Sequence, residues 1–498
     1  MILDMSPDQF RRAASMWGIA LCVLVAAAGW VFMKFGSAWS IADLPPSNYF
    51  YLIVPVYVVA EVAMIPVGAK LTDRFGCRTM VAVGPSIYII SSMICIISTS
   101  VEMLIVFRFL QGIGGGLLLG LAFTSVGRLY PPLDRGKCNE LMTAAFAIGS
   151  LFGTATGYFI TDTFNWRTGF VAFSACMLVG MVIAWFLLPR EEEKAEGVDI
   201  PGMVIAAAVF GSAALYTQLV NDRFGLITLT SAVFAAVVIL LVGMLVYRSY
   251  HCEHPTMPTH TTRFEKTHIL LMFMFSVCGL GLIQYFFKLY LMYYEFNIYK
   301  ASSIFLALLA GAAITSMIGG RLVFKTGARP WIVSGAAFVT VGLLLTHQIA
   351  DKGVLYMGIA LAVFGFGLGC IVTEILCSMQ SVVPAKHMGQ HTGNLMAVRM
   401  VGILAGNALI GSYIAEVIDT GREMTVIDLS STQDLMSNIS EHLTKALDYV
   451  AGALDSGFLT TTVILAMVTA LLTAVAHTLG RDDVEALEEC AEEDEGSE

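Results

Sequence analysis

The sequence predicts an all-α, polytopic membrane protein of about 14 transmembrane helices, arranged as two repeated six-helix halves plus two inserted helices. Composition is the first reason, because 57% of the 498 residues are apolar, only 13% are charged, and the mean hydropathy is +0.76. Soluble domains carry about 25% charged residues, so an ordinary soluble domain is excluded. The second reason is an internal repeat that covers both ends of the chain.

Hydrophobic segments long enough to cross about 30 Å of hydrocarbon follow one another along the chain. We expect transmembrane spans at residues 14–35, 49–69, 79–98, 102–126, 139–160, 168–188, 201–220, 227–247, 268–291, 299–321, 330–349, 354–379, 393–416 and 457–479. Such windows locate spans well and their ends poorly.

Lys and Arg concentrate in the loops on the side of the N-terminus, for example Arg74, Arg128 and Arg329. Cytoplasmic loops are enriched in these residues, so we expect a multi-pass protein of a cell (inner or plasma) membrane with both termini in the cytoplasm. The segment 481–498 is strongly acidic and supplies most of the net charge of −10. It is read as a solvated cytoplasmic tail that says nothing about the substrate.

The repeat has an offset of about 252 residues and divides the chain. Its clearest part places Gly112, Gly114 and Gly116 over Gly365, Gly367 and Gly369. We therefore expect an N-terminal six-helix half (1–190), two inserted helices with their loops (191–266), a C-terminal half (267–480) with an outer loop at about 417–456, and the acidic tail (481–498). Two parallel six-helix halves are typical of carriers that hold substrate at their interface.

The segment "GAKLTDRFGCRTM", residues 68–80, places four charges between two apolar spans. Gly68 and Gly76 would allow a tight reversal, and Asp73 is an acceptor that can face a helix N-terminus or an arginine. The segment resembles the loop between the second and third spans of the major facilitator superfamily, through Leu71, Asp73, Arg74, Gly76 and Arg78, with Ala69 in place of the leading Gly. The resemblance implies a cytoplasmic latch formed by Asp73, Arg74, Gly76 and Arg78. A mere topogenic charge cluster is the alternative.

Two further motifs carry the resemblance. "RFLQGIGGG", from Arg108, is similar to the fourth-span motif of the family, and "NWRTGF", from Asn165, resembles the opening of the sixth span in the 14-span drug:proton antiporter group. The fifth-span glycines resemble the antiporter motif, but Thr154 replaces its Pro and Tyr158 its last Gly. Gly112, Gly116 and Gly120 recur every four residues, which favours close helix packing.

Ionisable residues inside spans are the best functional candidates, because each costs at least about 2.5 kcal/mol near the membrane centre. Glu61 lies near the middle of the second span, where burial favours a neutral carboxyl that can exchange a proton. Arg108 is placed to sense that carboxylate, and Glu374 is a second proton candidate. Structural pairing is the alternative for Glu61 and Arg108.

Several polar and aromatic side chains are candidates for the substrate cavity. They are Trp30, Tyr57, Gln111, Gln284, Tyr285, Lys288, Arg399 and Asn407. Arg399 and Asn407 are expected to pair across the interface, and Lys288 either extends toward the membrane surface or attracts anions. The first span, "AAAGWVFMKFG", lacks the acid that drug antiporters of this group commonly carry, which makes cationic drugs a less certain substrate.

Together these features predict a secondary active transporter that works by alternating access, with proton-coupled efflux of amphipathic compounds or drugs as the leading function. A proton-coupled carrier for an organic anion or metabolite is the alternative, and a non-transporting membrane receptor is a remote one. We expect small-molecule substrate, protons and the lipid bilayer as partners, a monomer, and no nucleic acid, cofactor, metal or enzymatic activity. No GxxxxGK[ST] motif is present for ATP-driven pumping.

Overall fold

The computed structural model describes residues 7–189, 197–219, 228–252, 254–257, 263–277, 298–346, 349–383 and 387–424. All regular structure in these ranges is helical. The helices are α1 (Pro7–Asp43), η1 (Phe50–Leu52), α2 (Ile53–Phe75), α3 (Cys77–Ile96), α4 (Val101–Leu129), α5 (Pro132–Thr163), α6 (Trp166–Leu187), α7 (Ile200–Leu219), α8 (Leu229–His251), α9 (Arg263–Phe275), α11 (Ile298–Thr326), α12 (Ala328–Thr346), α13 (Ile349–Val382) and α14 (Met388–Met424).

The predicted spans fall on these helices in order, from the first span on α1 to the thirteenth on α14. The fourteenth, 457–479, lies outside the described residues, so the total of fourteen stays a prediction. Eight helices in the described ranges are long and apolar enough to cross a membrane. Helix α14 continues to Met424, beyond the predicted end of the thirteenth span at 416, and residues 425–456 of the expected outer loop lie outside the described residues.

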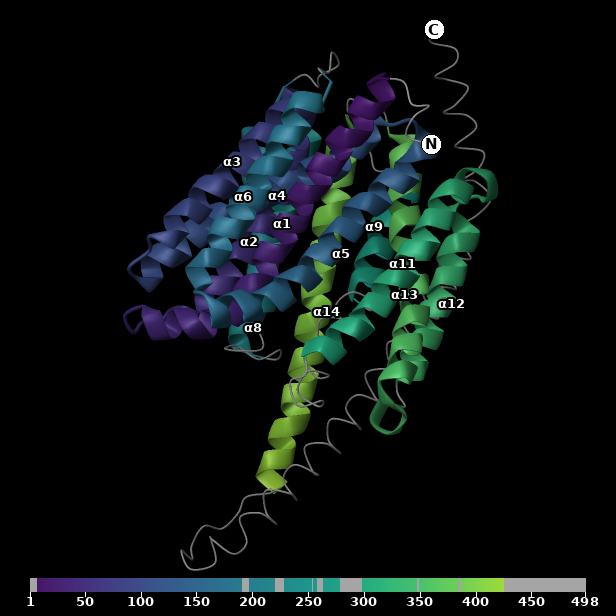
Figure 1. The fold of residues 1–498 in the computed structure, drawn as a ribbon. Coiled ribbons are helices and arrows are strands. Elements are labelled where there is room, and N and C mark those ends of the chain that lie inside the picture. Colours follow the sequence, from purple (N-terminus) through teal and green to yellow (C-terminus); the bar gives the residue numbers. More distant parts are fainter. Residues whose placement is uncertain are drawn as a thin grey trace, which may run out of the picture.

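The helices pack in two groups (Figure 1). Helices α1 to α6 contact one another, and α11, α12 and α13 form the second group, with α14 packed on α9. The groups meet where α2 and α4 contact α14, and where α5 contacts α11 and α13. The inserted helix α7 packs against α2 and α14, and α8 lies on α7. In the described part of the chain, the inserted helices therefore cover the contact between α2 and α14 but not the contact between α5 and α11.

Glycine stripes set the closeness of these helices. A Cβ added at Gly112, Gly116 or Gly120 of α4 would lie 2.2–2.3 Å from backbone carbonyl oxygens of α2. The second group repeats this contact, because Gly365 and Gly369 of α13 meet carbonyl oxygens of α11 in the same way. The predicted small-residue packing is thus confirmed in both copies of the repeat.

The turn between α2 and α3 depends on Gly76 alone, whose φ of 83° favours glycine. Its counterpart Gly327, between α11 and α12, has a φ of 76°. The prediction that Gly68 also serves this turn is wrong. Gly68 lies inside α2, where a Cβ would sit 2.6 Å from the Cα of Leu117, so it serves helix packing instead.

We expect Gly116→Ala to lower the thermal stability of the purified protein. The added methyl group must displace the carbonyl of Glu61 at 2.2 Å, and overpacking of this kind costs about 1–3 kcal/mol. Gly243→Ala in α8 is the matched control, because a Cβ there meets nothing within 4 Å. Thermal unfolding of both variants in the same detergent measures the difference. Equal stability would contradict the close α2–α4 contact.

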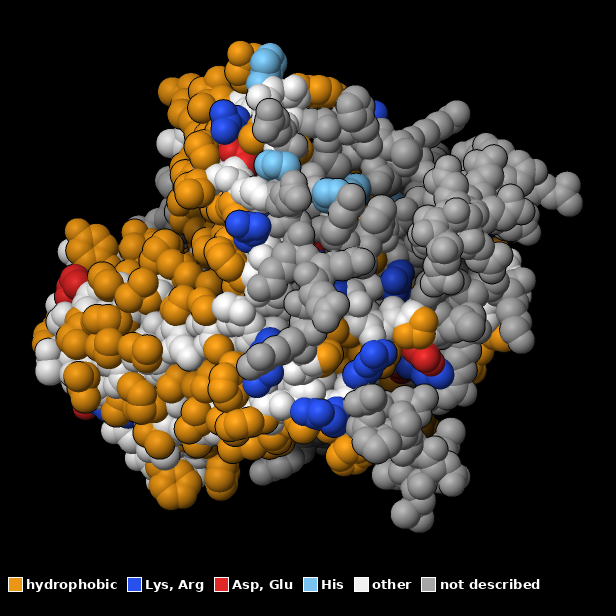
Figure 2. All heavy atoms as spheres, turned by 90° about the horizontal axis from the view of Figure 1, so that it is seen from above, with side chains coloured by type: hydrophobic (Ala, Val, Ile, Leu, Met, Phe, Trp, Pro, Cys, Tyr) orange, Lys and Arg blue, Asp and Glu red, His pale blue; other side chains and the backbone are white. Residues whose placement is uncertain are grey.

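The surface agrees with a membrane-embedded bundle (Figure 2). Viewed onto the end of the bundle at which α1 begins, hydrophobic side chains cover the flank, while Lys and Arg side chains gather toward the middle of this end. Large apolar side chains of α8 and α6, such as Ile239 and Phe186, are exposed on the outside. The chain is therefore a multi-pass membrane protein, and its orientation in the membrane stays a prediction.

Candidate functional site

Asp73, near the end of α2, joins the two groups of helices. Its Oδ1 accepts a hydrogen bond from the backbone N–H of Gly389 at 2.8 Å, and its Oδ2 accepts one from Gln390 at 3.0 Å. These N–H groups belong to the first turn of α14, where they have no partner within the helix. Arg128 of α4 forms an ion pair with the same carboxylate at 3.3 Å. A buried carboxylate thus caps a helix of the other half, where the helix dipole also favours negative charge.

The sequence around α14 permits this contact. A Cβ at Gly389 would lie 2.1 Å from the carbonyl oxygen of Ala69, and one at Gly393 would lie 2.3 Å from the Cβ of Ala69. The two glycines therefore let α14 touch α2 within reach of the Asp73 carboxylate. Ala69 stands where the family pattern has its leading Gly, and its methyl group is part of the contact.

The other predicted latch residues lie differently. Arg74 is exposed, and Arg78 places its guanidinium carbon 5.0 Å from the ring centre of Trp185 in α6, within its own half. Gly76 shapes the turn. Asp73 contacts the other half through its hydrogen bonds to Gly389 and Gln390.

A second contact between the halves lies on the α5 side, and sequence reasoning missed it. The Arg135 guanidinium of α5 donates to the backbone oxygen of Gln380 in α13. Asn139, one turn further on, donates to the Gln380 side chain at 2.7 Å, and Gln380 donates to the carbonyl of Phe123 in α4 at 3.1 Å. The internal repeat could have indicated this contact, because the start of α5 corresponds in the repeat to the start of α14, which binds Asp73.

A buried polar cluster lies inside the N-terminal half. The Tyr57 hydroxyl donates to Oε1 of Glu61 at 3.2 Å and contacts the carbonyl of Ala26 in α1 at the same distance. The Arg108 guanidinium lies over the Tyr57 ring, 4.3 Å from its centre. Gly115 leaves room for the carboxyl, because a Cβ there would lie 3.1 Å from Glu61 Oε1. The side chains of Tyr57, Glu61 and Arg108 are all 0% exposed.

The Arg108 guanidinium donates hydrogen bonds to acceptors other than Glu61. It donates to the Gln111 side chain at 2.7 Å and to the Gly29 carbonyl at 3.4 Å, and Gln111 donates to Ser92 at 2.6 Å. A direct bond between Arg108 and Glu61, the structural alternative, is absent among the described contacts, and both groups contact Tyr57 instead, Arg108 at its ring and Glu61 at its hydroxyl. Within the described residues, Oε2 of Glu61 has no hydrogen-bond partner.

Glu374, the second proton candidate, is buried in α13 of the C-terminal half. Neither carboxyl oxygen has a hydrogen-bond partner within the described structure. Gly319 of α11 leaves it room, since a Cβ there would lie 2.3 Å from Oε1. An ionised carboxylate without a partner is costly in such a place.

The cavity candidates divide into three groups. Trp30, Tyr57 and Gln111 are packed inside the N-terminal half in this conformation, so their role in binding substrate stays a prediction. Gln284, Tyr285 and Lys288 lie outside the described residues. Arg399 is buried and Asn407 half-buried on α14, and their expected pairing across the interface stays a prediction. Among the described residues, the polar contact of the Arg399 guanidinium is with the Met396 sulfur, at 4.0 Å.

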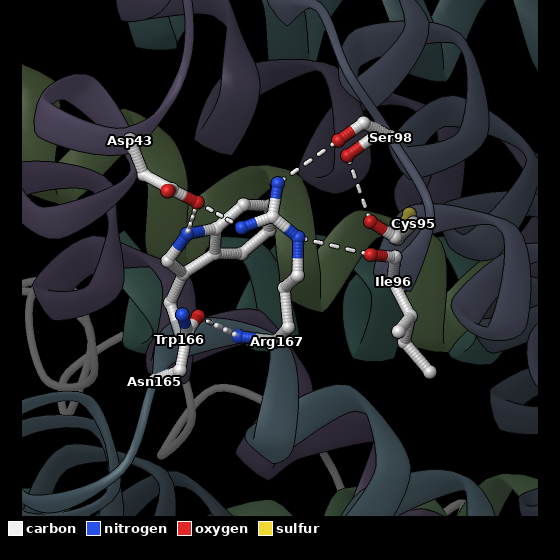
Figure 3. Close-up of polar contacts among 7 residues, drawn as sticks. All are labelled: Asp43, Cys95, Ile96, Ser98, Asn165, Trp166 and Arg167. Atoms are coloured by element: carbon white, nitrogen blue, oxygen red, sulfur yellow. Dashed lines mark hydrogen bonds and ion pairs between the residues drawn. The ribbon is translucent and has the colours of Figure 1, made fainter.

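The "NWR" motif forms a cluster at the opposite end of the N-terminal half (Figure 3). The Asn165 side chain accepts from the backbone N–H of Arg167 and caps α6. The Arg167 guanidinium donates to the carbonyls of Ile96 and Ser98 after α3, and it pairs with Asp43 at the end of α1. Trp166 also donates to Asp43, at 3.1 Å. The motif thus ties three helix ends of one half together.

The architecture is that of a membrane carrier built from two similar helical halves, joined at one end by polar contacts. Residues 19–407 match the Major Facilitator Superfamily, and the chain belongs to this family. The predicted family membership is confirmed.

Individual relatives share about a quarter of their residues with it. The multidrug transporter MdtP of Bacillus subtilis is 24% identical over 428 residues, which are 83% of this chain and 77% of MdtP. The riboflavin transporter RibZ of Clostridioides difficile is 23% identical over 384 residues, covering 73% of this chain and 79% of RibZ. The crystal structure of the human organic anion transporter MFSD10 (TETRAN) aligns with 94% of this chain and 100% of its own, at a TM-score of 0.62 and 13% identity.

Proposed function

We propose that this protein is a proton-coupled secondary active transporter that exports amphipathic compounds by alternating access. The observation that carries the proposal is the Asp73 carboxylate on the first turn of α14. It joins the two repeated halves at one end through two hydrogen bonds, which are few enough to break once in each cycle, and its ion pair with Arg128 lies within the N-terminal half. The Arg135–Asn139–Gln380 contact adds a second breakable connection at the same end.

The proton site is proposed at Glu61. Its carboxyl is buried, bonded through one oxygen to Tyr57, and separated from the Arg108 guanidinium by the Tyr57 ring. A small rearrangement of α1, α2 and α4 would bring the carboxyl closer to Arg108 or to water and favour its ionised form. Alternation between these surroundings would couple the proton to the change between conformations.

Two substrate classes are proposed, each on different evidence. Relatives named as multidrug transporters support export of amphipathic compounds. The absence of an acid from the first span, and the relative named as a riboflavin transporter, favour the second candidate, a proton-coupled carrier for an organic anion or metabolite. Both candidates share the same halves, contacts and proton site.

Transport into proteoliposomes with an imposed pH gradient tests the proposal. We expect accumulation of at least one amphipathic dye or flavin that disappears when an ionophore collapses the gradient. Counterflow of the same solute without any gradient would separate a carrier from a receptor. Uptake that is unaffected by the ionophore would rule out proton coupling, and the absence of counterflow for every solute would contradict transport.

A further inference from the structure

Arg399 is the exception among the buried arginines. The described residues bury three, Arg108, Arg135 and Arg399. The first two donate to oxygen acceptors, at the Gln111 side chain and the Gln380 carbonyl respectively. In the part of the chain that the structure describes, the polar contact of Arg399 is with the thioether of Met396, at 4.0 Å, and its Nε is buried without a hydrogen-bond partner. A thioether is a weak acceptor, so the charge of Arg399 is not compensated within the described structure.

An uncompensated buried guanidinium is costly, because arginine stays protonated even when it is desolvated. The buried charge of Asp73, by comparison, is compensated by two backbone N–H donors and an ion pair. Arg399 has no comparable arrangement among the described residues, which leaves its guanidinium available to a counter-charge from a molecule bound during the cycle.

The position of Arg399 on α14 lies where the two halves meet. Gly389 and Gly393 face α2 of the N-terminal half, and Gly402 and Gly406 face α9 of the C-terminal half. At about 100° per residue, Arg399 projects between these two faces. It lies about 16 Å along α14 from Met388, which is about half the thickness of a bilayer core.

The same face carries a second unsatisfied group. Thr392, two turns before Arg399, is 1% exposed, and its hydroxyl has no partner in the described structure. Met396 lies between them on this face and is also buried. The face therefore presents a charged donor, a hydroxyl and a polarisable apolar side chain, which suits a ligand with one anionic group on an apolar body.

We propose that Arg399 binds the anionic group of the transported compound, a carboxylate, sulfonate or phosphate ester, with Thr392 as a further donor. This inference rests on the proposed transport function and narrows its substrates to amphipathic organic anions. The guanidinium receives its counter-charge when substrate arrives, and Met396 contacts the adjoining apolar part.

Equilibrium binding of two dyes tests this assignment. Fluorescein is an anion and rhodamine 123 a cation on the same three-ring skeleton, so the pair isolates the effect of charge. With purified protein in lipid nanodiscs and no pH gradient, fluorescence anisotropy should show fluorescein binding that Arg399→Gln weakens at least tenfold, about the effect of one lost charge-assisted bond. Arg399→Lys should lie between, because lysine keeps the charge but not the forked geometry.

The controls separate binding from folding and from transport. Arg399→Gln should unfold at a temperature equal to or above that of the parent protein, because it removes an uncompensated buried charge. Lys137→Gln, which removes an exposed positive charge paired with Asp134 on the same helix, should leave fluorescein binding unchanged. Rhodamine 123 should bind Arg399→Gln at least as well as the parent.

Equal fluorescein affinity in Arg399→Gln and the parent would overturn the proposal, and so would a parent that prefers rhodamine 123. In either case the counter-charge of Arg399 would come from the chain itself in another conformation. Because binding is measured without a gradient, failure of proton coupling would leave this result standing.

Discussion

Asp73→Asn should slow transport at least tenfold while the protein still folds. The substitution keeps the shape of the side chain but replaces one carboxylate oxygen by an NH₂ group. Only one of the two N–H groups of Gly389 and Gln390 can then be accepted, and the ion pair with Arg128 is lost. Hydrogen bonds to charged groups contribute about 1.5–3 kcal/mol each, and 1.4 kcal/mol already changes an equilibrium tenfold.

The expected change lies in the populations of conformations, so two measurements are needed. Initial transport rates in proteoliposomes give the functional loss. Spin-label distances between Thr79 of α3 and Ser381 of α13 should show a larger share of molecules with separated halves at this end. Asp134→Asn is the matched control, because its partner Lys137 is exposed on the same helix and such pairs contribute at most about 1 kcal/mol. Normal rates and unchanged distances in Asp73→Asn would refute the latch.

The sequence predicted those features of the fold that depend on local pattern. Apolar windows located the helices, the glycine spacing indicated which faces pack closely, and Gly76 marked the turn. The ends of helices were less predictable, because α14 continues past its apolar window to Met424. The position of Gly68 was predicted wrongly for another reason: sequence alone does not distinguish a glycine that a turn requires from one that a neighbouring helix requires.

The candidate site was only partly predictable, since its contacts join residues far apart in the chain. The expected partners of Asp73, a helix N-terminus and an arginine, are both present. Their identities depend on how α14 docks on α2, which no local pattern specifies. The same applies to Gln380 and to the position of Tyr57 between Glu61 and Arg108. Rotation of a helix about its axis decides such contacts, and polar residues in spans constrain that rotation weakly.

Glu61→Gln should abolish accumulation driven by a pH gradient and leave energy-independent exchange largely intact. Glutamine has the shape of the protonated carboxyl and can still accept the hydrogen bond from Tyr57 at 3.2 Å. It cannot release a proton, so the conformational change would no longer be linked to the gradient. The buried position strengthens the expectation, because a group that is sealed from water must change its surroundings in order to ionise.

Two matched substitutions make the result specific. Glu102→Gln changes an exposed glutamate at the start of α4, bonded to Ser47 at 2.8 Å, and should leave accumulation unchanged. Glu374→Gln changes the buried glutamate of the C-terminal half and should retain accumulation if Glu61 is the coupling site. Accumulation against the gradient and exchange at equal pH are measured for all three variants in the same proteoliposomes. If Glu61→Gln accumulates substrate with normal pH dependence and Glu374→Gln does not, the coupling proton is carried in the C-terminal half, where the Glu374 carboxyl lies without a hydrogen-bond partner in the described structure.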